Sequence, residues 1–214
     1  MPSNLVKPNV IFGQIYDELE KEAMKLSYQI SLNEDQKKVY SINIAEMQLR
    51  IYTQIEAALK DIYVQMHPQQ KIPKYDEIIK LLNWLPDVVI YVPWQSYNLQ
   101  KKVYSDSFEK SVNRVTKVVA GQPQSGEKKN YKFNNAYQNL RHDFVNALPA
   151  FGTIEYLFEA LVVLCGILGK TSTLIFSGLV RTEEKNVYCA WVTAGGSRIR
   201  KIIRTDDRGQ ILSE

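Results

Sequence analysis

The stretch "NNAYQNLRHDFVNAL", residues 134–148, sets a histidine between an arginine and an aspartate, and the chain of 214 residues has only one other histidine. A histidine side chain can gain or lose a proton near neutral pH. Arg141 can bind a phosphate or stabilise developing negative charge, and Asp143 can orient the imidazole or pair with the arginine. These residue types around His142 suit acid–base chemistry beside an anion-binding cation.

Projection of this stretch on a helix, at 100° per residue, separates two faces. The apolar face must contact a core and consists of Phe133, Tyr137, Leu140, Phe144 and Leu148. The opposite face is polar and nearly uncharged and consists of Asn135, Gln138, Asn139, His142 and Asn146. Amides and imidazole both donate and accept hydrogen bonds. This face therefore suits a ligand cleft or a polar interface, or it caps and cross-links neighbouring helices.

The elements that would position this face are mostly helical. Apolar residues recur at three- and four-residue steps over residues 9–32 and 35–65, which predicts two long helices. Shorter helices are expected over residues 74–85, 106–119, 134–147 and 150–168. Pro149 fits a bend or the start of the last helix, and Gly169 fits its stop. The polar run "AGQPQSGEKKNYK", residues 120–132, predicts a loop that leads into the opening stretch.

Short runs rich in β-formers replace this periodicity near the C-terminus. They are "STLIFSGLVR", "NVYCAWVTA" and "RIRKIIRTDD", with plausible turns between them, and the earlier "VVIYVPW" predicts a short strand or an extended connection. The predicted fold class is mainly α: an antiparallel helical bundle with a short C-terminal β-hairpin or three-stranded meander. We expect the bundle to span residues 1–170 and the β appendage, packed on it, to span residues 171–214.

Composition narrows the functional classes. The net charge of +4 and the pI of about 8.9 permit a polyanionic partner, although most of these charges suit solvated faces. Both cysteines, Cys165 and Cys189, lie in apolar runs with no Cys/His cluster, so no metal site and no cofactor are expected. The run "RIRKIIR" could bind RNA backbone through Arg198, Arg200, Lys201 and Arg204, or it is an edge strand protected by charge.

No segment of the sequence predicts a membrane span. The most apolar region, residues 156–180, is interrupted by Glu159 and Lys170, and a span needs roughly 20 apolar residues. The N-terminus lacks the apolar core of a signal peptide. With only two cysteines in the chain, these observations lead us to expect a cytoplasmic protein.

The opening stretch resembles a signature of the HEPN superfamily. "AYQNLRHDF", followed by the apolar helix "FGTIEYLFEALVVLCGIL", is similar to the prokaryotic HEPN-like pattern YN-x-x-K/R-H-D-R. Tyr137, Arg141, His142 and Asp143 match it in kind, whereas Asn139 follows the tyrosine by two residues and Phe144 replaces the last basic residue. "IYTQIEAALKDIY", with Glu56 and Lys60 on one face, looks like the second helix of the superfamily, and the resemblance covers about residues 10–170.

The resemblance implies an antiparallel bundle that often dimerises through the motif helix. Many members are metal-independent RNases of toxin–antitoxin, abortive-infection and CRISPR-linked systems, in which an arginine a few residues before the histidine supplies the cation. In this chain no arginine or lysine lies five to seven positions before His142, and the nearest basic residue upstream of Arg141 is Lys132, ten residues before the histidine. A dimer could bring a second Arg141 or His142 into the same cleft.

Two functional hypotheses follow. In the first, the chain is an RNA-associated protein of a prokaryotic defence or toxin system, and in its catalytic form a metal-independent endoribonuclease. His142 is then the acid–base, Arg141 contacts phosphate or the transition state, and Tyr137, Asn139, Asp143 and Asn146 position them. In the second, the same polar face is a non-catalytic interface for a homodimer, another protein partner or an antitoxin. A small-molecule sensor has no supporting motif.

Overall fold

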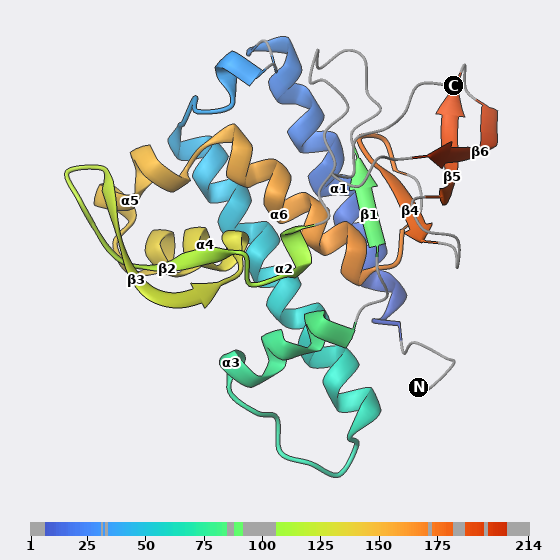
Figure 1. The fold of residues 1–214 in the computed structure, drawn as a ribbon, viewed down its shortest axis with the longest axis horizontal. Helices are drawn as coiled ribbons and strands as arrows, with labels where there is room; N and C mark the ends of the chain where they lie inside the picture. The colour runs from blue at the N-terminus through green and yellow to red at the C-terminus, as the bar shows by residue number, and fades with distance from the viewer. Residues whose placement is uncertain are drawn as a thin grey trace.

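The computed structural model describes residues 7–30, 32, 34–84, 88–91, 106–170, 173–181, 187–194 and 197–204. Within these ranges, six α-helices form the body of the molecule (Figure 1). They are α1 (Val10–Lys25), α2 (Ile42–Met66), α3 (Tyr75–Ile78), α4 (Lys132–His142), α5 (Phe144–Phe151) and α6 (Ile154–Ile167). The fold is mainly α with antiparallel strands at the C-terminus, which confirms the predicted fold class.

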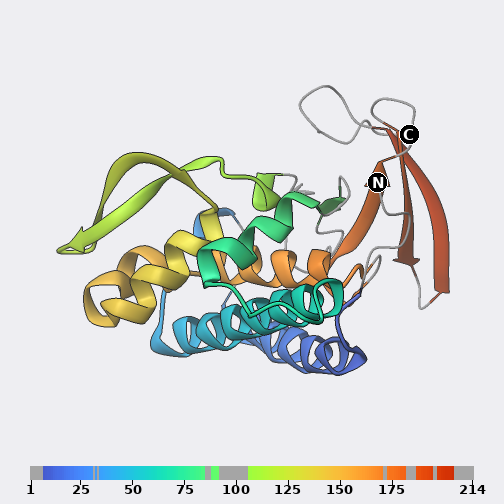
Figure 2. The ribbon, with the colours of Figure 1, turned by 90° about the horizontal axis from the view of Figure 1, so that it is seen from below.

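Helix α6 lies at the centre of the bundle because apolar residues occupy nearly all of its positions; Glu159 is its one buried carboxyl group. Every residue from Leu157 to Ile167 is buried, and the helix packs on α1, α2 and α4. Helix α2 turns one stripe towards α6, formed by Ile44, Ile51, Ile55 and Leu59. Figure 2 shows α1 and α2 lying side by side under the remaining helices. The segments in which the sequence shows a long helical repeat of apolar residues therefore form the hydrophobic core.

The first two helices are shorter than predicted. Helix α1 ends at Lys25 and a 3-10 turn follows at Leu26–Tyr28, so residues 9–32 are not one helix. Helix α2 begins at Ile42 because the hydroxyl of Ser41 accepts a hydrogen bond from the amide N–H of Ile44, at 3.1 Å. The predicted start at residue 35 is wrong, since residues 34–36 form a separate 3-10 turn.

The predicted helix over residues 134–147 is two helices. Helix α4 ends at His142, and Asp143 takes a non-helical conformation (φ −149°, ψ 65°) before α5 begins. The Asp143 carboxylate accepts hydrogen bonds from the side-chain amide of Asn146, at 3.0 and 3.1 Å. Local bonds of this kind compete with helix continuation. Pro149 lies inside α5 rather than at the start of α6, whereas Gly169 (φ +61°) does follow the end of α6.

The segment before α4 differs most from its prediction. Residues 106–119, expected to be a helix, contain a 3-10 turn (Asp106–Phe108) and strand β2 (Val112–Val119), and the expected loop is mostly strand β3 (Gln122–Asn130). The two strands pair antiparallel through Ala120 and Gly121, whose φ angles of 48° and 74° are typical of a type I′ hairpin turn. Most of β3 is exposed, so its polar composition gave no apolar alternation to detect.

A four-stranded antiparallel sheet has the order β1-β4-β5-β6, with β1 (Val88–Tyr91), β4 (Ser177–Arg181), β5 (Val187–Ala194) and β6 (Ser197–Arg204). The last three strands form the predicted meander, and β1 joins it from the other side of the expected boundary at residue 170. Figure 2 shows this sheet and the β2–β3 hairpin at opposite ends of the bundle. Among the helices of the described ranges, none is long and apolar enough to cross a membrane.

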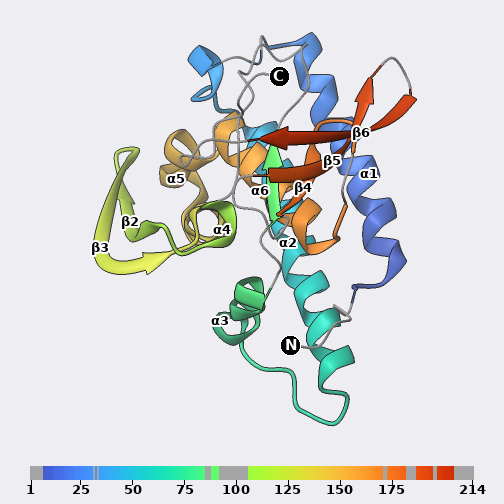
Figure 3. The same cartoon turned by 45° about the vertical axis from the view of Figure 1, so that its right-hand side comes forward.

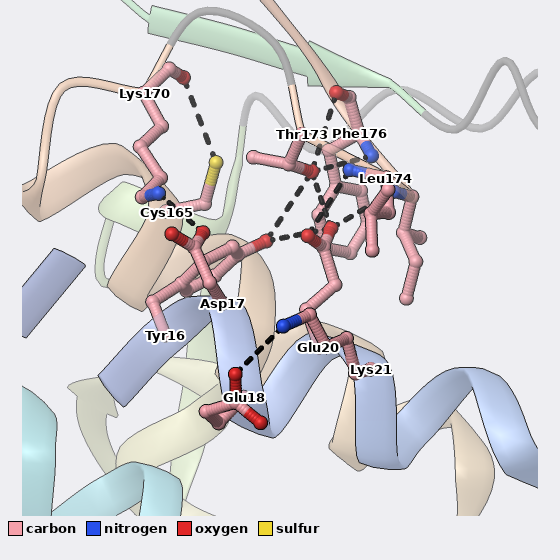
Figure 4. Close-up of polar contacts among 11 residues, drawn as sticks. Tyr16, Asp17, Glu18, Glu20, Lys21, Cys165, Lys170, Thr173, Leu174 and Phe176 are labelled. Atoms are coloured by element: carbon pink, nitrogen blue, oxygen red, sulfur yellow. Dashed lines mark hydrogen bonds and ion pairs between the residues drawn. The ribbon is translucent and has the colours of Figure 1, made fainter. Parts of the chain in front are cut away.

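A buried carboxylate joins α1 to the segment that precedes β4 (Figure 4). Glu20 is 1% exposed and accepts hydrogen bonds from the amide N–H groups of Leu174 and Ile175, at 3.0 and 2.8 Å. It also accepts from the hydroxyls of Thr173 and of Tyr16, the latter at 3.1 Å. A buried charge is tolerated only when it is paired or fully hydrogen-bonded, and these four donors meet that condition.

Candidate functional site

The β2–β3 hairpin lies over α4, and a cleft of about 680 Å³ separates them. Figure 3 shows the hairpin beside α4, away from the C-terminal sheet. The hairpin wall consists of residues 114–118, Gly126, Glu127, Lys128 and Asn130. The helix wall consists of Asn135, Gln138, Asn139, His142 and Asp143. The amide-rich face predicted from periodicity is thus one wall of a cleft, and a hairpin that was not predicted is the other.

Asn135 fastens the hairpin to the helix. It is 4% exposed, and its amide group donates to the carbonyl oxygen of Asn113 at 2.8 Å and accepts from the amide N–H of Val115 at 3.2 Å. These two backbone groups flank Arg114 and point to the same edge of β2, so the Asn135 amide takes the place of a neighbouring strand. Its carbonyl oxygen also accepts from the side-chain amide of Asn130, at 2.8 Å. The innermost part of the polar face is therefore structural.

A bulge in the hairpin shapes the cleft. Asn113 pairs with Lys129 and Val115 with Ser125, so Arg114 alone lies opposite the three residues Gly126, Glu127 and Lys128. Bulges interrupt the ladder, bend the strand and re-aim side chains. The bulged residues of both strands are lining residues of the cleft. This irregularity gives the hairpin a concave, partly unpaired wall.

The hairpin contributes three cations to the cleft: Arg114, Lys117 and Lys128. None of them forms an ion pair with a carboxylate in the part of the chain that the structure describes. Glu127 and Asp143 are the two acidic lining residues, so the lining has one net positive charge with histidine neutral. None of the described lining residues is a phenylalanine, tyrosine or tryptophan. The described lining therefore offers a ligand mainly charge and hydrogen bonds.

His142 is the last residue of α4 and its side chain is exposed at the cleft. Its ring makes no hydrogen bond to another described residue. The Asp143 carboxylate is bound to Asn146, not to the imidazole or to Arg141. Asn139 donates to the carbonyl oxygen of Asn135 at 2.9 Å, which holds the Asn139 amide against its own helix. The imidazole is thus free to contact a ligand in the cleft.

Arg141 lies in a different cleft, because adjacent helical residues point about 100° apart. This second cleft, of about 650 Å³, separates α2 from α4 and α5. Arg141 donates to the hydroxyl of Tyr137 at 3.3 Å, and that hydroxyl donates to the carboxylate of Glu56 at 3.1 Å. Glu56 also pairs with Lys60, at 2.6 Å. Within one chain, then, His142 and Asn139 share a cleft with Asp143, whereas Arg141 and Tyr137 do not join them.

Two remaining sets of predicted residues lie elsewhere. Asn146 is exposed beside Asp143 and lines neither cleft. The C-terminal basic residues belong to β6, which occupies one edge of the four-stranded sheet. The side chains of Arg198, Arg200, Lys201 and Arg204 are outside the described part of the structure, so their proposed contacts with RNA stay a prediction.

Sequence reasoning missed Arg114, Lys117 and Lys128 because their segments were assigned to a helix and a loop. A signal was present: valines and a threonine dominate residues 112–119, and "AG" separates that run from a second extended one. In the structure, this hairpin supplies cations to the cleft of His142, whereas Arg141 of the same helix lines the other cleft.

Among the described side chains, no group of three or more His, Cys, Asp or Glu residues could hold a metal ion. Compared with protein-family models, with curated proteins and with solved structures, the chain matches none of them.

Proposed function

We propose that this chain is an HEPN-like RNA-binding protein and that the cleft between α4 and the hairpin holds the RNA backbone. In this proposal, His142 acts in the cleft as the acid–base of a metal-independent RNA cleavage. One observation carries the proposal: three cations without described ionic partners line the same cleft as an exposed histidine. Cations of this kind bind phosphates and make binding dependent on salt. Gln138 and Asn139 add donors and acceptors suited to ribose hydroxyls and base edges.

The cleavage requires only groups that the cleft contains, together with water. The imidazole of His142 takes the proton of a ribose 2′-hydroxyl, and the oxygen attacks the adjacent phosphorus. The new bond between O2′ and phosphorus forms as the bond to O5′ breaks. O5′ takes a proton from water, and the hydroxide that remains takes the proton held by the His142 imidazolium, which restores the neutral imidazole. Arg114 and Lys128 stabilise the charge that develops on the phosphate oxygens. The products are a 2′,3′-cyclic phosphate and a 5′-hydroxyl.

The second hypothesis, a non-catalytic interface for a homodimer or an antitoxin-like protein, has one observation in its favour. Val145 is 80% exposed in α5, next to Asn146 and three residues after His142 in the sequence. The hairpin already covers the innermost part of the polar face at Asn135, which leaves only the outer part for a partner. The mass in solution of the wild type and of an Asn139→Lys/Asn146→Lys double variant tests this hypothesis, since a monomer in both excludes a homodimer through this face.

Cleavage of a fluorescent RNA in excess EDTA tests the proposed activity. His142→Ala should lower the rate by about 10²- to 10⁴-fold, which is the usual contribution of a general acid–base, and should leave binding within a few-fold of the wild type. His67→Ala is the matched control, because this second histidine ends α2 and contacts the ring of Tyr63. Equal cleavage by wild type and His142→Ala would exclude His142 as the acid–base. Binding without cleavage by the wild type would leave an RNA-binding module.

A further inference from the structure

We infer that Arg141 and Lys60 form a second subsite for an RNA phosphodiester, so that one strand passes around the C-terminal end of α4 and contacts both clefts. This inference rests on the proposed function and extends it to a separate surface. It assigns a role to Lys60, and it explains how Arg141 can act on RNA although it lies outside the cleft of His142.

The Arg141 side chain is held in place before any ligand binds. Its guanidinium donates to the Tyr137 hydroxyl at 3.3 Å and lies 5.7 Å from the centre of the Tyr137 ring. Tyr137 is 6% exposed and is itself held by Glu56, at 3.1 Å. Arg141 makes no ion pair with a carboxylate in the described ranges, so most of its N–H donors remain available to an anion. A planar donor group fixed in this way suits phosphate oxygens.

The charge of the second cleft matches a phosphodiester. Lys60 and Arg141 contribute two positive charges and Glu56 one negative charge, and the other described lining residues carry no carboxyl group or amine. The net charge of +1 complements the single negative charge of a phosphodiester. Glu56 holds Lys60 by one oxygen, at 2.6 Å, which leaves further ammonium hydrogens for the ligand.

The rest of the lining suits the uncharged part of a nucleotide. The half-buried Leu49, Ala57 and Phe144 supply apolar surface, and Phe144 supplies an aromatic ring, which no described lining residue of the hairpin cleft does. Bases stack on aromatic side chains with little dependence on sequence. The two clefts therefore complement each other: the first offers cations and amides, and the second adds a cation pair with an apolar wall.

The two subsites are close enough for one strand. Arg141 and His142 are neighbours in sequence, and the helix that separates their clefts is ~10–12 Å wide. At a rise of ~3.4 Å per nucleotide, about 3 nucleotides cross that width. An RNA of a dozen nucleotides is thus long enough to occupy both clefts at once.

The test measures binding of a labelled 2′-O-methyl 12-mer, which lacks the 2′-hydroxyl and cannot be cleaved. Arg141→Gln and Lys60→Gln should each weaken binding about 2- to 5-fold, and each should lower the slope of log K against log salt by about 0.7. Glu56→Gln should strengthen binding, because Lys60 loses its ionic partner while the Gln carbonyl can still accept from Tyr137. Lys25→Gln is the charge-matched control, since Lys25 is exposed and lines neither cleft.

Arg114→Gln in the hairpin separates the two proposals. If Arg141→Gln and Lys60→Gln bind as the Lys25→Gln control does while Arg114→Gln binds weakly, the second subsite is wrong and the hairpin cleft stands. If Arg114→Gln behaves as the control while the Arg141 and Lys60 variants bind weakly, the hairpin cleft is wrong and the second subsite stands. If the wild type does not bind the 12-mer at all, both are wrong.

Discussion

The Asn135 amide gives the most direct test of how this site is built. Asn135→Ala removes three hydrogen bonds: to the carbonyl oxygen of Asn113, from the amide N–H of Val115 and from the side chain of Asn130. It leaves those three groups facing a small apolar side chain. We expect the variant to loosen the hairpin from α4 and to open the cleft that contains His142.

The size of the effect follows from these contacts. Each intramolecular hydrogen bond contributes about 0.5–1.5 kcal/mol, and a buried group left without a partner costs about 1–3 kcal/mol. Val115 is half-buried, so water can reach part of the gap and lowers the cost. Alanine also favours the helix over asparagine by about 0.5 kcal/mol. The expected net loss in the free energy of unfolding is about 2–3 kcal/mol.

Urea denaturation and amide hydrogen exchange measure this loss. Asn139→Ala is the matched control, because it makes the same exchange on the same helix but removes only a bond to the α4 backbone. The Val115 amide should exchange at least about tenfold faster in Asn135→Ala than in the control, since 1.4 kcal/mol corresponds to a factor of ten. Equal urea midpoints and equal Val115 exchange in the two variants would refute the role assigned to Asn135.

Two further predictions concern the core. Glu20→Gln should lower the free energy of unfolding by about 2–3 kcal/mol, because the new amide group turns a donor towards backbone N–H groups that are themselves donors. Glu18→Gln, on the exposed face of α1, is the control and should change the free energy of unfolding by less than about 0.5 kcal/mol. The urea midpoints of the two variants measure the difference. Burial raises the pKa of the Cys165 thiol to about 12, so the unfolded chain loses this proton first as the pH rises. The free energy of unfolding should be at its maximum below about pH 8.5 and about 1–2 kcal/mol lower at pH 10. Cys165→Ala should lose less between these two pH values. Equal losses in the wild type and in Cys165→Ala would contradict the raised pKa of this thiol.

Local patterns were sufficient for much of the fold. Apolar residues recur three or four apart in α2 and fill most positions of α6, so these patterns predict the two helices and their buried faces. The same holds for Phe133, Tyr137 and Leu140, which are buried as the projection of α4 predicts. The end points were less accurate, because they depend on single contacts such as the Ser41 cap and the Asp143–Asn146 pair.

The hairpin shows why the rest of the site was missed. Val112, Val115 and Val118 recur at three-residue steps, a pattern that also fits a helix, and β3 has almost no apolar residue to signal a strand. What makes this segment a hairpin is its backbone pairing and its bonds to Asn135, which lies 20 residues beyond Val115. Such distant contacts leave no local periodicity.

The sequence by itself determined the helical bundle, the polar face around His142 and the C-terminal strands, because each is specified by neighbours within a turn or a strand. Only the tertiary structure decided which residues share a cleft. It places Arg114, Lys117 and Lys128 in the cleft of His142, and it places Arg141 in the other cleft with Lys60 and Tyr137. The physical reason is that adjacent helical side chains diverge by about 100°, whereas strands far away in sequence can be brought opposite either one.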